Sequence, residues 1–571
     1  MKKVSLFFVL PVFLLATFLF AFQIKKLPGK KEVKRTNVVT CGSPSAIGDA
    51  DTTARGKFIV KLPGWGHYSY PISTHNDSAR FYFNQGLTMY YSYHMKEALA
   101  SFKEAARFAP SSPMTYWGQA LSMGPYYNAN VYIVPKGLPA VLKQLNANAN
   151  NATEKEKALI RVMKLRYPVV QEQTTHDEKA YAQGMKKLIS AYPEDVDIKM
   201  LYIDAIMLIH PWDFWNTDGS SKEWTPELVD LCKSVLKASP EHPAALHYYI
   251  HLVEASRNPG AVMANAEPLK RLFPGVGHMV HMASHVYQRN GLYFQGVDAN
   301  DKANKSVLAY YSIAKNISLA KAIPHLYAVQ TYCAFSGGMY AKGMDAALHC
   351  RNSVSPAPDD NYSQYLYMMP VLTMVRLGKW DEILKDNIEP DPGWTYARIL
   401  KNFAKGLAFI YTGKPDSASR QLMLLQSNIN NPVLNGRRSP FNTALEGATI
   451  AENILAGAIL LAQNKYESGI AYLNKAVKVE DNMIYAEPAE WPIPARQFLG
   501  AYLLKNDDNT LAEQIYREDL VHNPGNGWSL LGLYQSLKAQ NQKEKLAEYK
   551  SGFLRSFSHA DVVPASSVFM N

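Results

Sequence analysis

The sequence predicts an all-α solenoid, a superhelix of helical hairpins, behind an N-terminal hydrophobic segment. Helical periodicity runs from Asp77 almost to the end of the chain, and small and aromatic residues recur along it at regular intervals. The length of 571 residues exceeds what one compact core can bury, whereas an array of repeats has no such limit. Hydrophobic residues make up 47% of the chain and charged residues 19%, which indicates a folded protein.

Residues 1–24 contain an uncharged apolar run from Val4 to Phe22, preceded by Lys2 and Lys3. The run just reaches the roughly 18 residues that cross a bilayer and exceeds the core of about 7–15 residues of a typical signal peptide. We therefore expect a signal peptide or a membrane anchor. The positive charge that follows the run favours a cytoplasmic body, whereas the short N-terminal layout favours export, which is the orientation we expect.

Basic residues are concentrated at the N-terminus, although the whole chain carries a formal net charge of +11. Residues 1–40 hold eight Lys and Arg against the single acidic residue Glu32. The remainder is nearly balanced, so we expect no nucleic-acid partner. The basic cluster instead flanks the apolar run, through which the membrane is an expected partner.

The chain divides into a linker and extended lead-in at 25–75, a helical array at 76–557 and a C-terminal tail at 558–571. The first hairpin shows the repeat pattern: Gly86 on one helix, Phe102 between alanines on the next, and the closing Pro110. Small residues let two helices approach, the aromatic ring fills the neighbouring gap, and proline ends the second helix. Near the end of the chain Gly500 and Tyr516 repeat this spacing, which is similar to the tetratricopeptide (TPR) repeat of about 34 residues.

Several longer motifs resemble a family of bacterial TPR proteins whose biochemical role is unsettled, with weaker similarity to tetratricopeptide repeat protein 38. The resemblance covers roughly residues 76–555 and implies a TPR-type α-solenoid. With an exported body, it places the protein in the bacterial cell envelope, on the periplasmic side. The motifs that carry it include Phe83-Asn84-Gln85-Gly86-Leu87, Tyr116-Trp117-Gly118-Gln119-Ala120, His210-Pro211-Trp212-Asp213 and the run from Asn523 to Trp528.

Histidines dominate two neighbouring segments, His247–Glu254 and His278–His285. Each segment holds a pair of histidines four residues apart, which puts both rings on one helix face. TPR spacing makes both segments first helices of adjacent hairpins, and such helices pack about 8–10 Å apart and line the concave face. We predict that these histidines meet in one groove.

Three hypotheses account for this cluster. The preferred one is a groove that recognises a protein, peptide or small ligand, without a cofactor and without catalysis. The alternative is a metal-dependent enzyme or metal-binding protein that holds Zn or another divalent transition metal. The third is that the rings only join helices by hydrogen bonds. The expected groove residues are His247, His251, Glu254, His278, His281, His285, Asp204, Trp212 and Trp215, and the expected metal ligands are His247, His251, His281 and His285.

The sequence argues against zinc-protease chemistry, because Tyr248 and Met282 stand where a His-Glu-x-x-His motif has its glutamate. It also lacks a phosphate-binding P-loop, a dinucleotide fingerprint and the Gly-x-Ser-x-Gly motif of hydrolases.

Two aromatic loops are further candidates. The run from His210 to Trp215 is either a wall of the groove or a packed loop that ends a helix. A second polar and aromatic cluster is expected to be ordered by an ion pair between Glu487 and Arg496, or else to form a second ligand wall. Its members are Tyr485, Glu487, Trp491 and Arg496.

Overall fold

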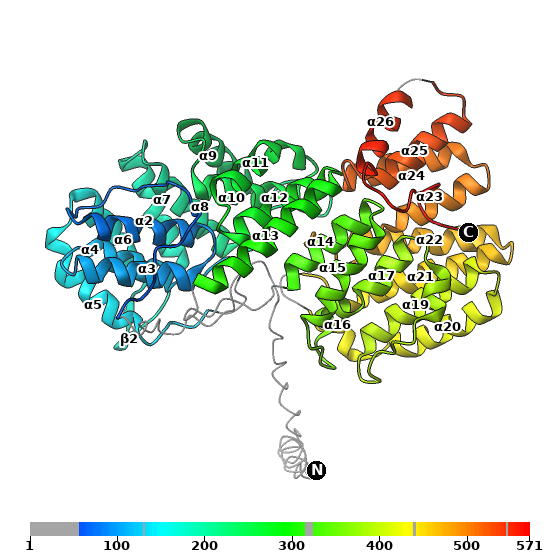
Figure 1. Ribbon diagram of the computed structural model, residues 1–571, viewed down its shortest axis with the longest axis horizontal. Coiled ribbons are helices and arrows are strands. Elements are labelled where there is room, and N and C mark those ends of the chain that lie inside the picture. Colours follow the sequence, from blue (N-terminus) through cyan, green and yellow to red (C-terminus); the bar gives the residue numbers. More distant parts are fainter. Residues whose placement is uncertain (1–55, 129–131, 314–323, 438–440, 544–545, 571) are drawn as a thin grey trace, which may run out of the picture. The chain divides into compact units, whose positions relative to one another are not determined.

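The computed structural model describes residues 56–128, 132–313, 324–437, 441–543 and 546–570. All of them lie in one compact unit, Val38–Asn571. The predicted signal peptide or anchor at residues 1–24 lies outside the described residues. Helices follow one another through this unit in chain order, from α2 to α26 (Figure 1).

Their bounds are α2 (Asp77–Tyr91), α3 (Met95–Phe108), α4 (Pro113–Ser122), α5 (Leu138–Asn148), α6 (Glu154–Arg166), α7 (Glu178–Ala191), α8 (Val196–Ile209), α9 (Thr225–Ala238), α10 (Pro243–Val253), α11 (Met263–Leu272), α12 (Gly277–Arg289), α13 (Tyr293–Ile313), α14 (Pro324–Ser336), α15 (Tyr340–Asn352), α16 (Asn361–Tyr367), α17 (Met369–Arg376), α18 (Trp380–Lys385), α19 (Thr395–Tyr411), α20 (Pro415–Ile429), α21 (Ala444–Ala462), α22 (Tyr466–Asp481), α23 (Ala495–Lys505), α24 (Asn509–His522), α25 (Gly527–Ala539) and α26 (Leu546–Ser556).

The all-α prediction is confirmed. Within the described ranges the one sheet is the pair of two-residue strands β1 (Val169–Val170) and β2 (Gln173–Thr174). Successive helices pack as hairpins, among them α2 with α3, α12 with α13 and α21 with α22. Local sequence determines where several helices begin. The side chain of Asn76 accepts a hydrogen bond from the backbone N–H of Ala79 in the first turn of α2, and Thr153 and Glu156 form a capping box at the start of α6.

The small and aromatic residues of the repeat pattern pack as the sequence predicts. The ring of Phe102 lies between two helices, where a Cβ atom on Gly86 would stand 2.9 Å from it and one on Gly118 2.3 Å. Tyr516 occupies the equivalent place near the end of the chain, at 2.5 Å from a Cβ on Gly500 and 2.2 Å from one on Gly532. Glycine is required at these positions because the ring fills the space of a side chain.

The segments before and after the helices pack against them. In the lead-in, Leu62 is buried and its backbone N–H donates to Oε1 of Gln85 at 2.8 Å. In the tail, the backbone N–H of Val562 donates to the carbonyl of Gly338 at 2.9 Å, and Oγ of Ser567 donates to the carbonyl of Gln497 at 2.9 Å. The described parts of the lead-in and tail therefore join helices that are distant in the chain.

One helix among the described residues, α21, is long and apolar enough to cross a membrane. Two thirds of its most apolar stretch (67%) is buried inside the protein, as in the core helix of a repeat array.

The inner helices α10 and α12 are buried along their whole length, and α14 is buried from His325 to Ser336 apart from Tyr327. They pack side by side, α10 on α12 and α12 on α14, and α10 also packs on α2. The face predicted as an open groove is therefore filled here by the protein's own chain.

Candidate metal centre

Six buried histidines meet on the three inner helices. We call His247, His251 and His278, from α10 and α12, the first trio. The second trio is His281, His285 and His325, from α12 and α14. No side chain of the six is more than 4% exposed. Within each trio, ring nitrogens from all three residues lie within 4.8 Å of one another.

The first trio is centred on His247. Its Nε2 lies 3.1 Å from Nε2 of His251 and 3.0 Å from Nε2 of His278. Nitrogen ligands bound to one zinc ion at 2.0–2.1 Å lie about 2.9–3.4 Å apart for angles between square and tetrahedral. Two of the three nitrogen separations therefore match those of ligands of a single ion, and the third pair lies within 4.8 Å.

The backbone determines which nitrogen of His247 carries the proton. Nδ1 lies 2.7 Å from the carbonyl oxygen of Tyr91, which can only accept, so Nδ1 donates. Burial lowers the pKa of His247 well below its ordinary value, so the ring is neutral and Nε2 is unprotonated. One lone pair on Nε2 then faces two nitrogens, and a single hydrogen bond cannot satisfy both.

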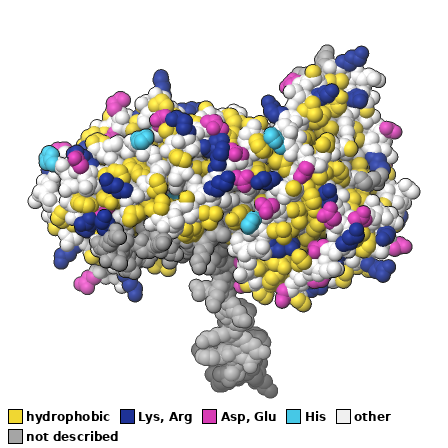
Figure 2. Space-filling view, viewed as in Figure 1, with side chains coloured by type: hydrophobic (Ala, Val, Ile, Leu, Met, Phe, Trp, Pro, Cys, Tyr) yellow, Lys and Arg dark blue, Asp and Glu magenta, His cyan; other side chains and the backbone are white. Residues whose placement is uncertain are grey.

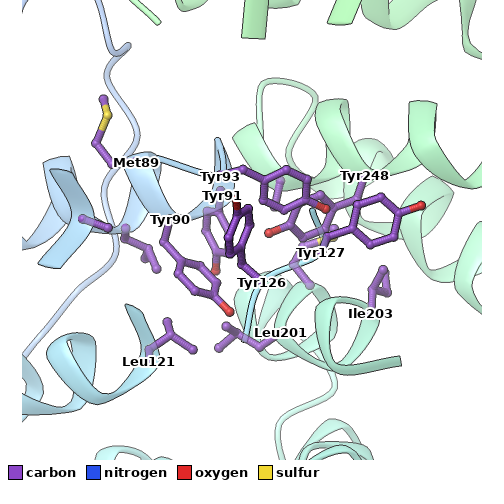
Figure 3. Close-up of a cluster of buried hydrophobic side chains, with 14 of the residues drawn as sticks. Met89, Tyr90, Tyr91, Tyr93, Leu121, Tyr126, Tyr127, Leu201, Ile203 and Tyr248 are labelled. Carbon is purple, nitrogen blue, oxygen red and sulfur yellow. The ribbon is translucent and has the colours of Figure 1, made fainter. Parts of the chain in front are cut away.

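Aromatic rings close the first trio from the side of α2. The ring of Tyr93 lies 4.6 Å from that of His247 and 5.7 Å from that of His278, and Tyr127 lies 5.1 Å from His251. Tyr93, Tyr127 and Tyr248 are grouped in one buried cluster (Figure 3). Burial lowers the pKa of His278 well below its ordinary value and that of His251 to about 4. The trio is thus three neutral imidazoles in a site shielded from water.

The second trio has a similar arrangement. Nδ1 of His281 donates to Oδ1 of Asn300 at 2.6 Å, and the amide of Asn300 is oriented by a bond from Nδ2 to the carbonyl of Gly296 at 3.0 Å. Nε2 of His281 lies 3.0 Å from Nε2 of His285. The ring of His325 lies 4.9 Å from that of His281 and 5.6 Å from that of His285.

Two buried carboxyl groups stand beside the trios. Oε1 of Glu254 lies 2.9 Å from Nδ1 of His251, and Oε2 of Glu487 lies 2.7 Å from Nε2 of His285. Burial, reinforced by Glu487, raises the pKa of Glu254 well above its ordinary value. Burial would also raise the pKa of Glu487, but His285 and His251 hold it below the ordinary value. Glu487 is thus the ionised carboxylate of the two.

The ion pair expected between Glu487 and Arg496 does not form. Arg496 pairs instead with Asp481, with Nη2 2.8 Å from Oδ2, because the end of α22 lies opposite the first turn of α23. Glu487 points away from Arg496, to His285. The second cluster is therefore divided: Glu487 joins the histidines, and Trp491 is 3% exposed and packs its ring 5.3 Å from that of Phe403.

The other predicted groove residues lie around the histidines, in different surroundings. Asp204 accepts a hydrogen bond from Tyr90 in the tyrosine cluster. Nε1 of Trp212 donates to Oε1 of Glu487 at 3.4 Å, and Nε1 of Trp215 donates to the carbonyl of Leu252 at 2.7 Å. Trp212 thus lies next to Glu487, and Trp215 lies against α10.

The run from His210 to Trp215 also contributes to the lining of a pocket of about 480 Å³. The residues that line it include none of the six trio histidines, but they include much of the two aromatic loops. Among them are Trp212, Trp215, Tyr485, Trp491 and Arg496.

The sequence predicted one metal site formed by His247, His251, His281 and His285, and it did not predict His325. The four predicted metal ligands fall into two sets, because His278 reaches His247 and His325 reaches His281. A signal for His325 exists in the sequence: it is the second residue of α14, as His278 is the second residue of α12. Glu487 had no such signal as a partner of His285, because the loop between α22 and α23 is distant in the chain.

Surface charge is mixed. On the face shown in Figure 2, Lys and Arg side chains are interspersed with Asp and Glu. The absence of a nucleic-acid partner stays a prediction.

No family model and no curated protein matches the chain. Among solved structures, yeast Tom70 is 12% identical, with 83% of this chain and 92% of that chain covered and a TM-score of 0.34. A human IFIT1 dimer with m7Gppp-AAAA is 11% identical, with 85% and 91% covered and a TM-score of 0.30. The P58(IPK) TPR domain is 12% identical, with 82% and 99% covered and a TM-score of 0.18. With TM-scores this low, these likenesses say nothing about function, and the fold rests on the helices of this chain.

Proposed function

We propose that this protein binds a divalent transition-metal ion at His247, His251 and His278. The observation that carries the proposal is the approach of Nε2 of His251 and Nε2 of His278 to 3.0–3.1 Å from Nε2 of His247, which has no proton. A cation between them accepts a lone pair from each ring, which hydrogen bonds alone cannot do.

The surroundings support a metal ion as well. Metal-bound histidines commonly donate their other ring nitrogen to a backbone carbonyl or carboxylate, which orients the ring. His247 has the carbonyl of Tyr91 in this place, and Nδ1 of His251 lies 2.9 Å from Oε1 of the Glu254 carboxyl group, which is protonated in the metal-free protein. A set of neutral imidazoles suits Zn, Cu, Ni or Fe better than Mg or Ca, which prefer oxygen ligands.

Elemental analysis of the purified full-length chain, dialysed against buffer without metal, tests this proposal. We expect stoichiometric metal in the wild type and its loss from this trio in His278→Gln. The matched control is His242→Gln, since His242 is equally buried but lies beside Asp197, outside both trios. A wild-type chain that stays metal-free after incubation with Zn²⁺, Cu²⁺ and Ni²⁺ would refute the proposal.

We propose, as a second function, that the pocket of about 480 Å³ recognises a small polar ligand. Recognition of a ligand is thus proposed for this pocket between the aromatic loops and no longer for the buried histidines. The volume of the pocket suits a small molecule better than a folded partner. Charged side chains of both signs line it, which favours a zwitterion such as a free amino acid or dipeptide: Arg257, Arg289, Arg496, Asp481 and Asp519.

Thermal-shift measurements with free amino acids and dipeptides test this second proposal. We expect a shift in the wild type that disappears in Trp212→Ala and persists in Trp394→Ala, because Trp394 packs on Tyr367 and does not line the pocket. Equal shifts in both variants would argue against the pocket.

We also propose that the chain is exported to the periplasmic side of a bacterial cell envelope and belongs with the bacterial TPR proteins that its motifs resemble. The apolar run Val4–Phe22 and the Lys-Lys start support export. Fractionation of cells that express the full chain, with a protease-accessibility assay, would test it.

A further inference from the structure

We propose that a second divalent transition-metal ion binds at His281, His285 and His325, with Glu487 as its carboxylate ligand, so that the protein holds a two-metal centre. This inference rests on the proposed function of the first trio and extends it by a second site and a shared carboxylate.

Three donor atoms of the second site already stand at the spacing of one coordination sphere. Nε2 of His281 lies 3.0 Å from Nε2 of His285, which in turn lies 2.7 Å from Oε2 of Glu487. Zinc bonds of about 2.0–2.2 Å put ligand atoms about 2.8 Å or more apart, so the nitrogen pair has the required spacing and Oε2 of Glu487 would move slightly outward to bind an ion. His325 is the fourth candidate ligand, because its donor nitrogen lies within 4.8 Å of those of His281 and His285.

Hydrogen bonds from neighbouring side chains orient the proposed ligand atoms of His281 and Glu487 toward the second trio. Asn300 accepts from Nδ1 of His281, so Nε2 is the unprotonated nitrogen and points to His285. Nε1 of Trp212 donates to the other oxygen of Glu487 at 3.4 Å, which turns Oε2 to the second trio. In the metal-free protein the buried carboxylate of Glu487 pairs with His285, whose pKa it raises, and a metal ion bound here would take the place of that proton.

Glu487 connects the two sites. Its carboxylate contacts His285 of the second trio, and it also lies within 4.8 Å of the donor atoms of His251 and Glu254. The rings of His278, from the first trio, and His281, from the second, have centroids 6.2 Å apart. Two ions in these sites would therefore be neighbours that share one carboxylate, as in two-metal centres of other proteins.

The test is a titration of the metal-free full-length chain with Co²⁺, followed by visible absorption, with bound metal measured after gel filtration. We expect two ions per chain in the wild type and in His242→Gln, and one in either His278→Gln or His325→Gln. Glu487→Gln should weaken binding of the second ion by at least about tenfold, because it removes a ligand but keeps the shape. With Cu²⁺ in place of Co²⁺, electron paramagnetic resonance should show coupling between two ions that each single-site variant abolishes.

The outcomes separate the two proposals. One ion in the wild type that is lost in His278→Gln and kept in His325→Gln would overturn the second site and leave the proposed function. One ion that is lost only in His325→Gln would overturn the first site. No bound ion would overturn both. The wild-type stoichiometry and spin coupling do not depend on the folding of any variant, and circular dichroism identifies a variant that is misfolded.

Discussion

At the scale of single residues, Asn300 shows how a side chain that binds nothing itself can prepare a site. Its Nδ2 donates to the carbonyl of Gly296, one turn earlier in α13, so its Oδ1 faces His281 as an acceptor. This hydrogen bond sets both the tautomer and the angle of the His281 ring. Asn300 is therefore a positioning residue for the second trio.

Replacing Asn300 should weaken the second metal site without affecting the first. In Asn300→Ala the His281 ring loses its orienting acceptor, and we expect a loss of about 10–100-fold in affinity for the second ion. Chelator competition against Zn²⁺ would measure it. Asn304→Ala, on the same helix but bonded to Gln330, is the matched control and should bind as the wild type does. Equal affinity in both variants would contradict the positioning role.

Asp204 is a residue whose charge state depends on burial. Burial raises its pKa to about 7, although the hydrogen bond from Tyr90 and the charge of Arg166 oppose the shift. The ordinary value in an unfolded chain is about 3.9. The folded protein therefore holds a proton here that the unfolded chain releases above about pH 4.

This difference should make stability fall as pH rises. The contribution of Asp204 is complete below the unfolded pKa and is lost as pH rises through the folded pKa of about 7. We expect the free energy of unfolding of the metal-free wild type to decrease between pH 5 and pH 8 more steeply than that of Asp204→Asn, which is neutral throughout. Urea titrations at several pH values would measure both slopes, and parallel slopes would contradict the shifted pKa.

At the scale of helices, the packing of one aromatic ring between glycines joins successive hairpins. Phe102 of α3 is fully buried and lies against Gly86 of α2 and Gly118 of α4. The ring thus joins a hairpin to the next one, which is how a repeat array gains stability from its neighbours.

Gly118→Ala should destabilise this junction by about 1–3 kcal/mol, because the new methyl group would overlap the Phe102 ring. Hydrogen exchange of α2, α3 and α4 should report the loss locally, since long arrays need not unfold in one step. Adding Phe102→Leu to Gly118→Ala should cost less than the sum of the two single changes, because the smaller side chain frees space. Strict additivity would show that the two residues do not compete for the same volume.

These helices also show what the sequence can predict and what it cannot. Spacing of Gly86, Phe102 and Pro110 predicts hairpins because it reflects contacts between neighbours in the chain. The histidine pairs of α10 and α12 share one face for the same reason. Their division into two trios depends on how α10, α12 and α14 are placed side by side, and the role of Glu487 depends on a loop that follows α22. No pattern within a single helix predicts the two trios or the contact of Glu487. The open groove expected along α10 and α12 is filled by Tyr93 and its neighbours.

At the scale of the whole chain, the described C-terminal segment holds distant helices together. The backbone N–H of Ala341, at the start of α15, donates to Oδ2 of Asp561 at 2.9 Å, and Asp561 also accepts from Tyr340. Nη1 of Arg376 donates to the carbonyl of Ser567 at 3.4 Å. A side chain of the tail thus accepts hydrogen bonds from the first turn of a helix 220 positions earlier in the chain.

Asp561→Ala should cost about 1 kcal/mol, the usual value of a lost N-cap. The loss should appear as faster hydrogen exchange at the first turn of α15, where Tyr340 and Ala341 lose their acceptor. Val563→Ala is the control, because Val563 is 74% exposed and should change little. If both substitutions left exchange in α15 unchanged, the tail would not stabilise that helix.

The contact between His285 and Glu487 has a consequence for biosynthesis. A ribosome releases the chain from its N-terminus, so all six histidines emerge well before the loop that carries Glu487. Until that loop arrives, the imidazoles lack the one ionised carboxylate that meets them in the finished protein. Metal captured early would be held by nitrogen alone, and the complete ligand set exists only near the end of translation. The ligand set proposed for the second ion would therefore be complete only late in translation, after the loop that carries Glu487 has been made.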